Sequence, residues 1–502
     1  MRYNSSMLCE SSSRVNGQRK LRFLIRGQSL PDSNWLNQAL AALGHAVIES
    51  RLTPAECDVL LVHDPSAATV REVEAARRTG ILTILRSWRD PETLEAAGSS
   101  AAGYDWVVTT GLAGMVNAYA SVGARAVTLL PSAPPLVSPR NPRPRDYDII
   151  FAGRLTGPER KLRLDFLRRA ASKWKVAVIT DDAAAWNGAH PLAASRLEEF
   201  HRRARLTLHT DRIALNRFGV TRGCPARRPF FGPAFGCVLL AELRPWLLHC
   251  FDPASEMAGF ADEEQAICEA AALLEDPQRM ESIAAAGAER VRADHLPERR
   301  ARQLVTLASG TVPAAMQVLA LGPWYQQIEL PGGEKTCLLE HSNVKRWQRL
   351  KHVFPDVRGR SVLDLGMNAG FFSLECVRRG STRVCGVECS PLSCAQARFV
   401  FEQWRTNIVE VLERDILEAP AGPFDVCLAL ALLHHFENIG PLLRIATERC
   451  REVVLEWGLR EGSFYHPVED VTNWFKRAGW NPVVVSEGVR PIVIARADGH
   501  AV

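Results

Sequence analysis

Short apolar runs alternate with amphipathic segments along most of the chain. The runs LRFLIR at 21–26 and CDVLLVH at 57–63 have the length of single strands, and segments with helical periodicity separate them. This alternation predicts parallel strands with helices on both faces of a sheet. Residues 21–137 are therefore expected to form one α/β unit, which follows a polar, flexible tail at 1–20.

A proline-rich stretch, PSAPPLVSPRNPRPR at 131–145, interrupts the alternation. Because proline blocks both helices and strand ladders, this stretch predicts a linker between two units. The alternation starts again at 146 and continues to about 310, which predicts a second α/β unit. Its later part is expected to contain helices at 233–243, 263–274 and 277–294.

A third alternating unit is expected at 311–498. Its predicted strands lie at 361–365, 383–388, 408–413, 425–429 and 452–456. The final stretch, NPVVVSEGVRPIVIARA, has two apolar runs joined by a short polar segment, which predicts an antiparallel pair. The predicted fold class is therefore α/β, with three consecutive Rossmann-like units.

Composition and charge exclude several classes of protein. The 502 residues are 47% apolar and 23% charged, which is typical of a soluble protein with several domains. With 61 basic against 56 acidic residues, the net charge of +5 suits small anionic ligands such as nucleotides, and nucleic acid is not the expected partner. No apolar run reaches the length of a membrane span, and the N-terminal residues lack a secretory apolar region. The 13 cysteines include no C-x-x-C pair, so we expect no metal site and reduced thiols in the cytoplasm.

The stretch VLDLGMNAGFFSLECVRRG at 362–380 carries the clearest chemical signal. An apolar strand leads into a turn that contains Gly366, Asn368 and Gly370, and a helical pattern follows. Glycines at such a turn let backbone amides approach a ligand. The spacing differs from G-x-G-x-x-G, which argues against a nicotinamide or flavin dinucleotide.

Three carboxylates accompany this turn. Asp364 lies in the first strand, Glu388 ends the next strand, and Asp415 follows the third. An acid after the second strand can hold a ribose diol, and an acid after the third can accept a hydrogen bond from an adenine amine. A domain of the same fold that binds no cofactor is the alternative at this point.

This ordered set resembles the class I S-adenosylmethionine-dependent methyltransferases. The turn looks most like the group that includes the tRNA wobble-uridine modifying methyltransferase-like proteins, and WYQQIELPGG at 324–333 is similar to the segment that precedes the fold in that group. The resemblance covers about residues 320–497. It implies S-adenosylmethionine as the cofactor, surrounded by Asp364, Gly366, Asn368, Gly370, Glu388 and Asp415.

Candidate catalytic residues follow the next two strands. The run FDVCLALALLHHF at 424–436 presents His434 and His435, and VVLEWG contains Glu456. A histidine can act as a base when the methyl acceptor is a hydroxyl group. His435 matches a histidine that is common in the similar group, whereas His434 stands where that group more often has tyrosine. Each of these three side chains can instead pack, form a hydrogen bond or cap a loop. The catalytic and the structural interpretation therefore both stay open.

The second unit opens with DIIFAGRLTGPERKLRL at 148–164, in which a strand is followed by Gly153, Arg154 and Lys161. A strand end, a glycine and cations beside a helix start can cradle a diphosphate. Two Rossmann-like units joined by a proline-rich linker resemble a GT-B glycosyltransferase of the group 1 type, which implies a nucleotide-sugar donor. Several cations of the helix are expected simply on its solvated face, among Lys161, Arg163, Arg168, Arg169 and Lys173.

Residues 227–295 resemble the C-terminal region of glycosyltransferases similar to the spore-protein maturation group. The matching residues are Arg228, Phe231, Gly236, Glu256 and His295. One residue departs from the resemblance, because Gly232 stands where the family has a glutamate that contacts the donor sugar or ribose. Glycine cannot accept a hydrogen bond from a hydroxyl, so donor binding is expected to be altered or lost. The predicted donor-binding set is Gly153, Arg154, Lys161, Arg228 and Glu256.

The leading hypothesis is a bifunctional enzyme. It would transfer a sugar from a nucleotide sugar, and a methyl group from S-adenosylmethionine, to a hydroxyl of a glycan or glycoconjugate. The alternative is a methyltransferase that acts on RNA or a small molecule, in which an inactive GT-B module serves as a recognition scaffold. Nucleotide-sugar binding and salt-dependent RNA binding separate these hypotheses.

Overall fold

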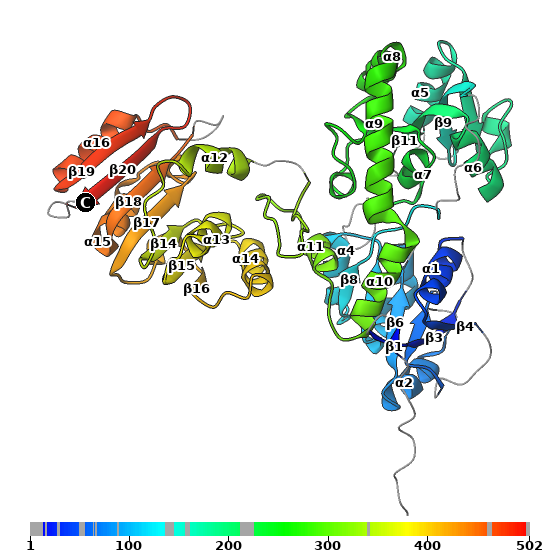
Figure 1. Cartoon of the computed structure of the whole chain (residues 1–502), viewed down its shortest axis with the longest axis horizontal. Helices are drawn as coiled ribbons and strands as arrows, with labels where there is room; N and C mark the ends of the chain where they lie inside the picture. Colours follow the sequence, from blue (N-terminus) through cyan, green and yellow to red (C-terminus); the bar gives the residue numbers. More distant parts are fainter. Residues whose placement is uncertain are drawn as a thin grey trace, which may run out of the picture. The chain divides into compact units, whose positions relative to one another are not determined.

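The computed structural model describes residues 14–15, 18–27, 31–49, 56–63, 65, 68–87, 90–135, 145–155, 161–210, 225–338, 342–458 and 464–497. The chain divides into two compact units, Met1–Gly322 and Pro323–Val502 (Figure 1). Most of the predicted tail and residues 136–144 of the predicted linker lie outside the described residues. In the tail, Arg14–Val15 (β1) pairs antiparallel with Gln18–Arg19 (β2).

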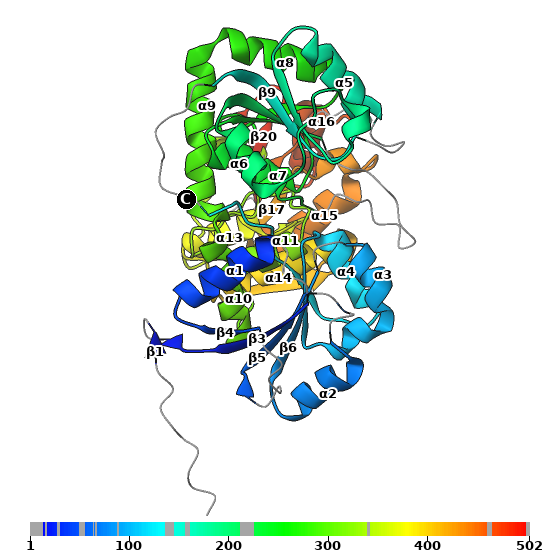
Figure 2. The ribbon, with the colours of Figure 1, turned by 90° about the vertical axis from the view of Figure 1, so that its right-hand side faces the viewer.

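The first unit begins with a parallel sheet whose described strands follow the order β4-β3-β5-β6-β7-β8. These strands are β3 (Arg22–Arg26), β4 (Ala46–Ile48), β5 (Val59–Val62), β6 (Leu82–Arg86), β7 (Trp106–Thr109) and β8 (Ala126–Thr128). Helices α2 (Val70–Arg78), α3 (Glu92–Ala97) and α4 (Ala113–Ser121) pack on one face. The other face is covered by α1 (Pro31–Ala42) and α10 (Pro297–Ala308), which lie side by side (Figure 2).

A second parallel sheet completes the unit, and its described strands follow the order β10-β9-β11-β12-β13. They are β9 (Tyr147–Ala152), β10 (Val176–Ile179), β11 (Ala204–His209), β12 (Val238–Glu242) and β13 (Ala258–Phe260). The helices are α5 (Lys161–Ala171), α6 (Ala194–His201), α7 (Arg228–Ala234), α8 (Glu263–Glu275) and α9 (Pro277–Arg290). Buried residues of α5 and α8 pack against the strands, as expected for a sheet covered by helices.

The helix predicted at 233–243 is wrong. Helix α7 ends at Ala234, Gly236 turns the chain with a φ of 79°, and the next residues form β12. Four consecutive residues of this strand are buried. A continuous apolar run fits a central parallel strand as well as a helix, so periodicity could not separate the two. The helices predicted at 263–274 and 277–294 are confirmed as α8 and α9, and a π-helical turn, Val291–His295, follows α9.

Two buried side chains join the halves of the first unit where the chain returns from α9 to α10. Arg300 donates hydrogen bonds to the carbonyl oxygen of Leu130 and to Nδ1 of His295, each at 2.9 Å. The Nε2 atom of His295 lies 3.0 Å from the carbonyl oxygen of Cys250. Burial and the charge of Arg300 lower the pKa of His295 to about 3, so the ring is neutral. His295, which the sequence resemblance singled out, therefore serves the packing of this unit.

The second unit contains a mixed sheet whose described strands follow the order β16-β15-β14-β17-β18-β20-β19. They are β14 (Ser361–Leu365), β15 (Arg383–Glu388), β16 (Val409–Glu413), β17 (Phe424–Leu430), β18 (Cys450–Glu456), β19 (Trp480–Ser486) and β20 (Ile492–Ala497). All pairs are parallel except those of β20, which confirms the predicted antiparallel end. The helices are α12 (Ser342–Leu350), α13 (Phe371–Arg378), α14 (Pro391–Gln403), α15 (Gly440–Arg449) and α16 (Val468–Arg477).

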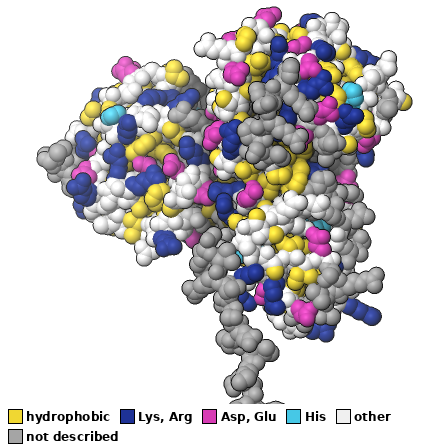
Figure 3. Space-filling model, turned by 45° about the vertical axis from the view of Figure 1, so that its right-hand side comes forward, with side chains coloured by type: hydrophobic (Ala, Val, Ile, Leu, Met, Phe, Trp, Pro, Cys, Tyr) yellow, Lys and Arg dark blue, Asp and Glu magenta, His cyan; other side chains and the backbone are white. Residues whose placement is uncertain are grey.

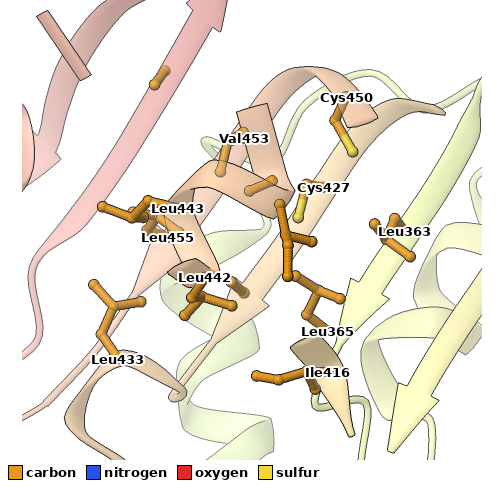
Figure 4. Close-up of a cluster of buried hydrophobic side chains, with 14 of the residues drawn as sticks. Leu363, Leu365, Ile416, Cys427, Leu433, Leu442, Leu443, Cys450, Val453 and Leu455 are labelled. Carbon is orange, nitrogen blue, oxygen red and sulfur yellow. The ribbon is translucent and has the colours of Figure 1, made fainter. Parts of the chain in front are cut away.

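The order of this sheet reverses at β14, because the chain moves from β14 to β15 and β16 on one side and then crosses to β17 on the other. Figure 4 shows part of the apolar core along these strands, in which Leu365 lies near Ile416, and Cys427 lies between Leu363 and Val453. In open α/β sheets, ligands bind at the carboxyl ends of the strands, where the order reverses. The α/β fold class is thus confirmed, and the sheet itself indicates where to look for a site.

The structure places the boundary between the two units after Gly322. Residues 311–322, which the sequence assigns to the third unit, contain helix α11 (Ala314–Ala320). This helix packs on α4 and β8, and Met316 is buried in the core of the first unit. The last unit therefore begins at Pro323 instead of residue 311. Among the described residues, no helix combines the length and the apolar character needed to cross a membrane.

Candidate functional site

The turn between β14 and α13, residues 366–370, is here called the glycine loop. Its backbone is left-handed at Gly366 (φ 70°), Asn368 (φ 54°) and Gly370 (φ 87°), which explains both glycines of the loop. The close approach of neighbouring side chains also explains these glycines. A Cβ atom on Gly366 would lie 3.0 Å from Leu432, and one on Gly370 would lie 2.5 Å from the ring of Phe401. The loop backbone is therefore packed closely between neighbouring elements.

Glu388 lies directly beside the glycine loop, at the carboxyl end of β15. Its Oε2 atom accepts a hydrogen bond from the backbone N–H of Asn368 at 3.0 Å, and its Oε1 atom accepts one from the N–H of Ser390 at 2.8 Å. Its side chain is 9% exposed. The structure thus brings Gly366, Asn368, Gly370 and Glu388 together, although Glu388 is on a different strand.

Asp364 and Asp415 occupy different environments. Asp364 is buried in β14 and accepts a hydrogen bond from the hydroxyl of Ser373 at 2.6 Å, which fixes α13 to the strand. Burial raises the pKa of Asp364 to about 6. Asp415 is exposed after β16, and its Oδ1 atom accepts a hydrogen bond from the N–H of Leu417 at 2.8 Å. Asp364 therefore links β14 to α13, the two elements that flank the glycine loop, whereas Asp415 is accessible to a ligand.

The two candidate histidines follow β17 in a short helical turn, Leu433–His435. His434 is buried and His435 is exposed, and their ring centroids are 4.2 Å apart. The turn adjoins the glycine loop, because Leu432 is the residue that a side chain on Gly366 would touch. Of the two, His435 is the ring that a ligand at this edge can reach.

Glu456 ends β18 and is 1% exposed. Its Oε2 atom is 2.8 Å from a guanidinium nitrogen of Arg346, and its Oε1 atom is 3.3 Å from Nε of Arg490. Arg346 is itself 5% exposed. The carboxylate predicted as a catalytic acid is thus enclosed between two cations, which is the environment of a structural ion pair.

The predicted donor site of the first unit is partly assembled at the carboxyl end of β9. Gly153 has a φ of 155°, and a Cβ atom there would overlap the guanidinium group of Arg228. Arg228 donates a hydrogen bond to the carbonyl oxygen of Ala152 at 2.7 Å. Arg154 is exposed beside them. Lys161 begins α5, and its side chain lies outside the described residues.

Arg163 is a residue that the sequence analysis missed at this edge. It was expected among the solvated cations of α5, and Arg168, Arg169 and Lys173 are indeed exposed. Arg163 is 5% exposed instead. It donates to the carbonyl oxygen of Arg154 and to the hydroxyl of Thr210, both at 2.7 Å, and so ties the end of β9 to the end of β11.

Glu256 is not brought to this edge. It precedes β13 in a parallel sheet, so it lies at the amino end of the strands, opposite Gly153 and Arg154. Its carboxylate accepts from Arg290 at 2.9 and 3.0 Å and from the N–H of Asp252 at 2.9 Å. The sequence alone could not show at which end of the sheet Glu256 lies, because the chain returns to the amino end of the sheet between β12 and β13.

The space beside Gly232 is filled by a neighbouring side chain. Gly232 lies in α7 against β11, and a Cβ atom would overlap the side chain of Thr207. Helix α7 reads RPFFGPA and carries no acidic residue. The preceding residue, Phe231, has its ring 6.0 Å from that of Trp35 and 5.9 Å from that of His201. A carboxylate at this helix is therefore absent in sequence and excluded by packing at residue 232.

Two family models match parts of this chain. Residues 160–306 match a model described as glycosyl transferase-like, and residues 362–454 match a methyltransferase domain. The chain carries a glycosyltransferase-like domain and a methyltransferase domain. The first match spans α5 to α10, and the second runs from β14 into β18 and includes the glycine loop, Glu388 and both histidines.

Two curated relatives are similar to parts of this chain. One is a protein of Methanocaldococcus jannaschii named provisionally as a protein N5-glutamine methyltransferase, 32% identical over 75 residues, which are 14% of this chain and 36% of the relative. The other is the tRNA U34 carboxymethyltransferase of Shewanella frigidimarina, 29% identical over 92 residues, which are 18% of this chain and 28% of the relative. The matches span about a third of these relatives. Among solved structures, the magnesium protoporphyrin IX methyltransferase of Synechocystis PCC 6803 is 19% identical, with a TM-score of 0.27 over 31% of this chain and 77% of that one.

The described cysteines of both domains are free thiols, and most of them are buried. Burial raises the pKa of several of the buried thiols, for example to about 11 at Cys385. Within the described ranges, no group of three or more His, Cys, Asp or Glu side chains is placed to hold a metal ion.

Proposed function

We propose that the methyltransferase domain binds S-adenosylmethionine at the carboxyl edge of its sheet and transfers the methyl group to a hydroxyl. The observation that carries this proposal is the carboxylate of Glu388, held beside the glycine loop by the N–H of Asn368. An acid in this position can hold the two hydroxyls of a ribose, while the loop backbone approaches the rest of the ligand. The exposed carboxylate of Asp415 can accept from an adenine amine.

The bound cofactor supplies a methyl group that is already activated. The residues of the chain then have to bind, orient and exclude water. His435 is the proposed base, because it is exposed at the same edge and a hydroxyl acceptor must lose a proton. Glu456 is left out of this role, since Arg346 and Arg490 hold its carboxylate.

The proposed acceptor is a glycan or glycoconjugate. A glycosyltransferase-like domain precedes the methyltransferase domain in the same chain, and tethering keeps one domain's product at high effective concentration near the other. The names of the two curated relatives point to different acceptors, so their similarity does not select one. On the face shown in Figure 3, basic and acidic side chains are interspersed, which gives no support to a nucleic-acid acceptor.

Replacing Glu388 with alanine is expected to weaken the binding of S-adenosylhomocysteine by about 1–3 kcal/mol, or roughly 5- to 150-fold in Kd. The change removes a charged acceptor for the ribose hydroxyls and also frees the N–H of Asn368. Titration calorimetry on the full chain measures the loss. Glu413→Ala is the matched control, because Glu413 is the register partner of Glu388 on β16 and pairs with Arg398 at the surface. Equal affinity in wild type and Glu388→Ala would remove the ribose assignment.

For the first unit we propose sugar transfer from a nucleotide sugar, with the diphosphate at the β9 edge. Gly153 and the exposed Arg154 support this, because they place a glycine and a cation at one strand end, where the buried Arg163 holds the backbone of Arg154. A specific observation favours a second candidate, a recognition module without transfer activity. Helix α7 lacks the acid that the resemblance requires, and Thr207 fills the space at Gly232.

Calorimetry of the full chain against UDP-, GDP- and dTDP-sugars separates these two candidates. A donor site at the β9 edge is supported if the wild type binds one of these nucleotide sugars, Arg154→Ala loses that binding and Arg168→Ala keeps it. Arg168 is the control because it lies exposed on α5, away from the strand end. No binding of any donor, by a chain that still binds S-adenosylhomocysteine, supports the recognition module.

A further inference from the structure

Residues 323–338, here called the strap, precede the region that matches the methyltransferase family model. The strap is rigid through its own buried hydrogen bonds. The hydroxyl of Thr336 donates to the carbonyl oxygen of Gln326 at 2.7 Å and accepts from the N–H of Ile328 at 2.9 Å. The N–H of Thr336 in turn donates to the carbonyl oxygen of Ile328 at 3.0 Å. Thr336 is 0% exposed and Gln326 is 3% exposed.

Two helices of the domain fix the strap from outside. Asn343 of α12 accepts from the N–H of Gln327 at 3.1 Å and donates to its carbonyl oxygen at 3.0 Å. Gln396 of α14 donates to the carbonyl oxygen of Pro323 at 2.9 Å. The backbone on either side of Gln326 is therefore held, and the direction of its side chain is determined by the fold.

The side chain of Gln326 spans the glycine loop. Its Nε2 atom donates to the carbonyl oxygen of Met367 at 3.3 Å, near the start of the loop. Its Oε1 atom accepts from the N–H of Phe371 at 3.0 Å, at the first residue of α13. That N–H is one of the helix-start donors that have no partner within the helix. Only a side chain with both a donor and an acceptor makes these two bonds, and a primary amide provides both.

We propose that Gln326 is a positioning residue for the cofactor site. The loop that it spans has a left-handed backbone at three positions, a conformation that depends on the contacts around it. The N–H of Asn368, which Glu388 binds, lies inside the spanned segment. Holding Met367 and Phe371 thus fixes the distance between the loop backbone and the carboxylate of Glu388. This inference rests on the proposed binding of S-adenosylmethionine.

The test is calorimetry of the full chain with S-adenosylhomocysteine, in wild type and two variants. Gln326→Met keeps the volume and loses both bonds to the loop, and it is expected to raise Kd about tenfold. Gln327→Met is the matched control, because Gln327 is the next residue and its amide donates to the carbonyl oxygens of Cys337 and Leu338 within the strap. The control is expected to stay within about twofold of wild type. The thermal unfolding midpoint without ligand is expected to be similar in both variants.

Each other outcome counts against the inference. Unchanged affinity in Gln326→Met, or an equal loss in both variants, means that the loop does not depend on Gln326. Failure of wild type to bind S-adenosylhomocysteine overturns the proposed function itself, and the inference with it. Hydrogen exchange of wild type gives a second measurement that needs no variant. Ligand binding is expected to protect the amides of Ile328 and Phe371 together, and protection of Phe371 without Ile328 contradicts coupling through the strap.

Discussion

Replacing Glu456 with glutamine is expected to lower the free energy of unfolding of the methyltransferase domain by about 3–5 kcal/mol. Glutamine has almost the same shape, so the loss is electrostatic. Without the carboxylate, the guanidinium group of Arg346 stays 5% exposed and loses its directly paired carboxylate, and Arg490 loses the same partner. Denaturant unfolding at neutral pH, followed by a signal from this domain, measures the change.

Glu452→Gln is the control for that experiment. Glu452 lies on the same strand, is 5% exposed, and also pairs with two arginines, Arg360 at 2.8 Å and Arg496 at 2.7 Å. These arginine side chains are 30% and 40% exposed, so water can solvate them when the carboxylate is lost. Glu452→Gln is therefore expected to lower the free energy of unfolding by less than Glu456→Gln does. A Glu456→Gln chain as stable as wild type, yet unable to transfer a methyl group, would return Glu456 to the catalytic role that the sequence suggested.

Local sequence was enough to predict the glycine loop and the acid beside it. The strands at 361–365 and 383–388 are confirmed with the same bounds, because each is a short apolar run that ends at a clear break in the pattern. Glu388 could be placed beside the loop because parallel neighbours in a βαβ unit bring their carboxyl ends together. The site residues predicted from this motif depend on one supersecondary unit, which is local in sequence.

The rest of the site depends on contacts between distant residues, which no local pattern encodes. Gln326 reaches the loop from 41 residues upstream, at Met367, and nothing in WYQQIELPGG distinguishes it from Gln327. Arg163 has the sequence context of a surface cation and is buried by Thr210 and Arg154. Glu456 was a candidate acid in sequence, and only the fold places Arg346, which is 110 residues away, against it.

Gly232→Ala is expected to destabilise the first unit by about 1–3 kcal/mol, as is usual for overpacking a core. An added methyl group at this position overlaps Cγ2 of Thr207, which is 4% exposed in the middle of β11. Calorimetric unfolding of the full chain measures the shift of the first unit. Gly103→Ala is the matched control, because a Cβ atom there meets nothing within 4 Å, and it is expected to be neutral.

The variant Thr207→Ser tests whether the overlap with Thr207 causes the loss of stability in Gly232→Ala. Serine lacks the Cγ2 atom that the new methyl group would overlap, and it keeps the hydroxyl that lies 3.2 Å from Nε2 of His201. The Cβ atom of residue 207 remains 2.9 Å from the added methyl group in this background. The double variant Gly232→Ala, Thr207→Ser is therefore expected to recover part of the stability that Gly232→Ala loses, with a coupling of about 1 kcal/mol. Additive effects would mean that α7 moves away from β11 freely, and a glutamate at residue 232 could then be accommodated. Strong coupling means that restoring the acid of the resembling family requires changing β11 as well, which ties any loss of donor binding to the packing of this sheet.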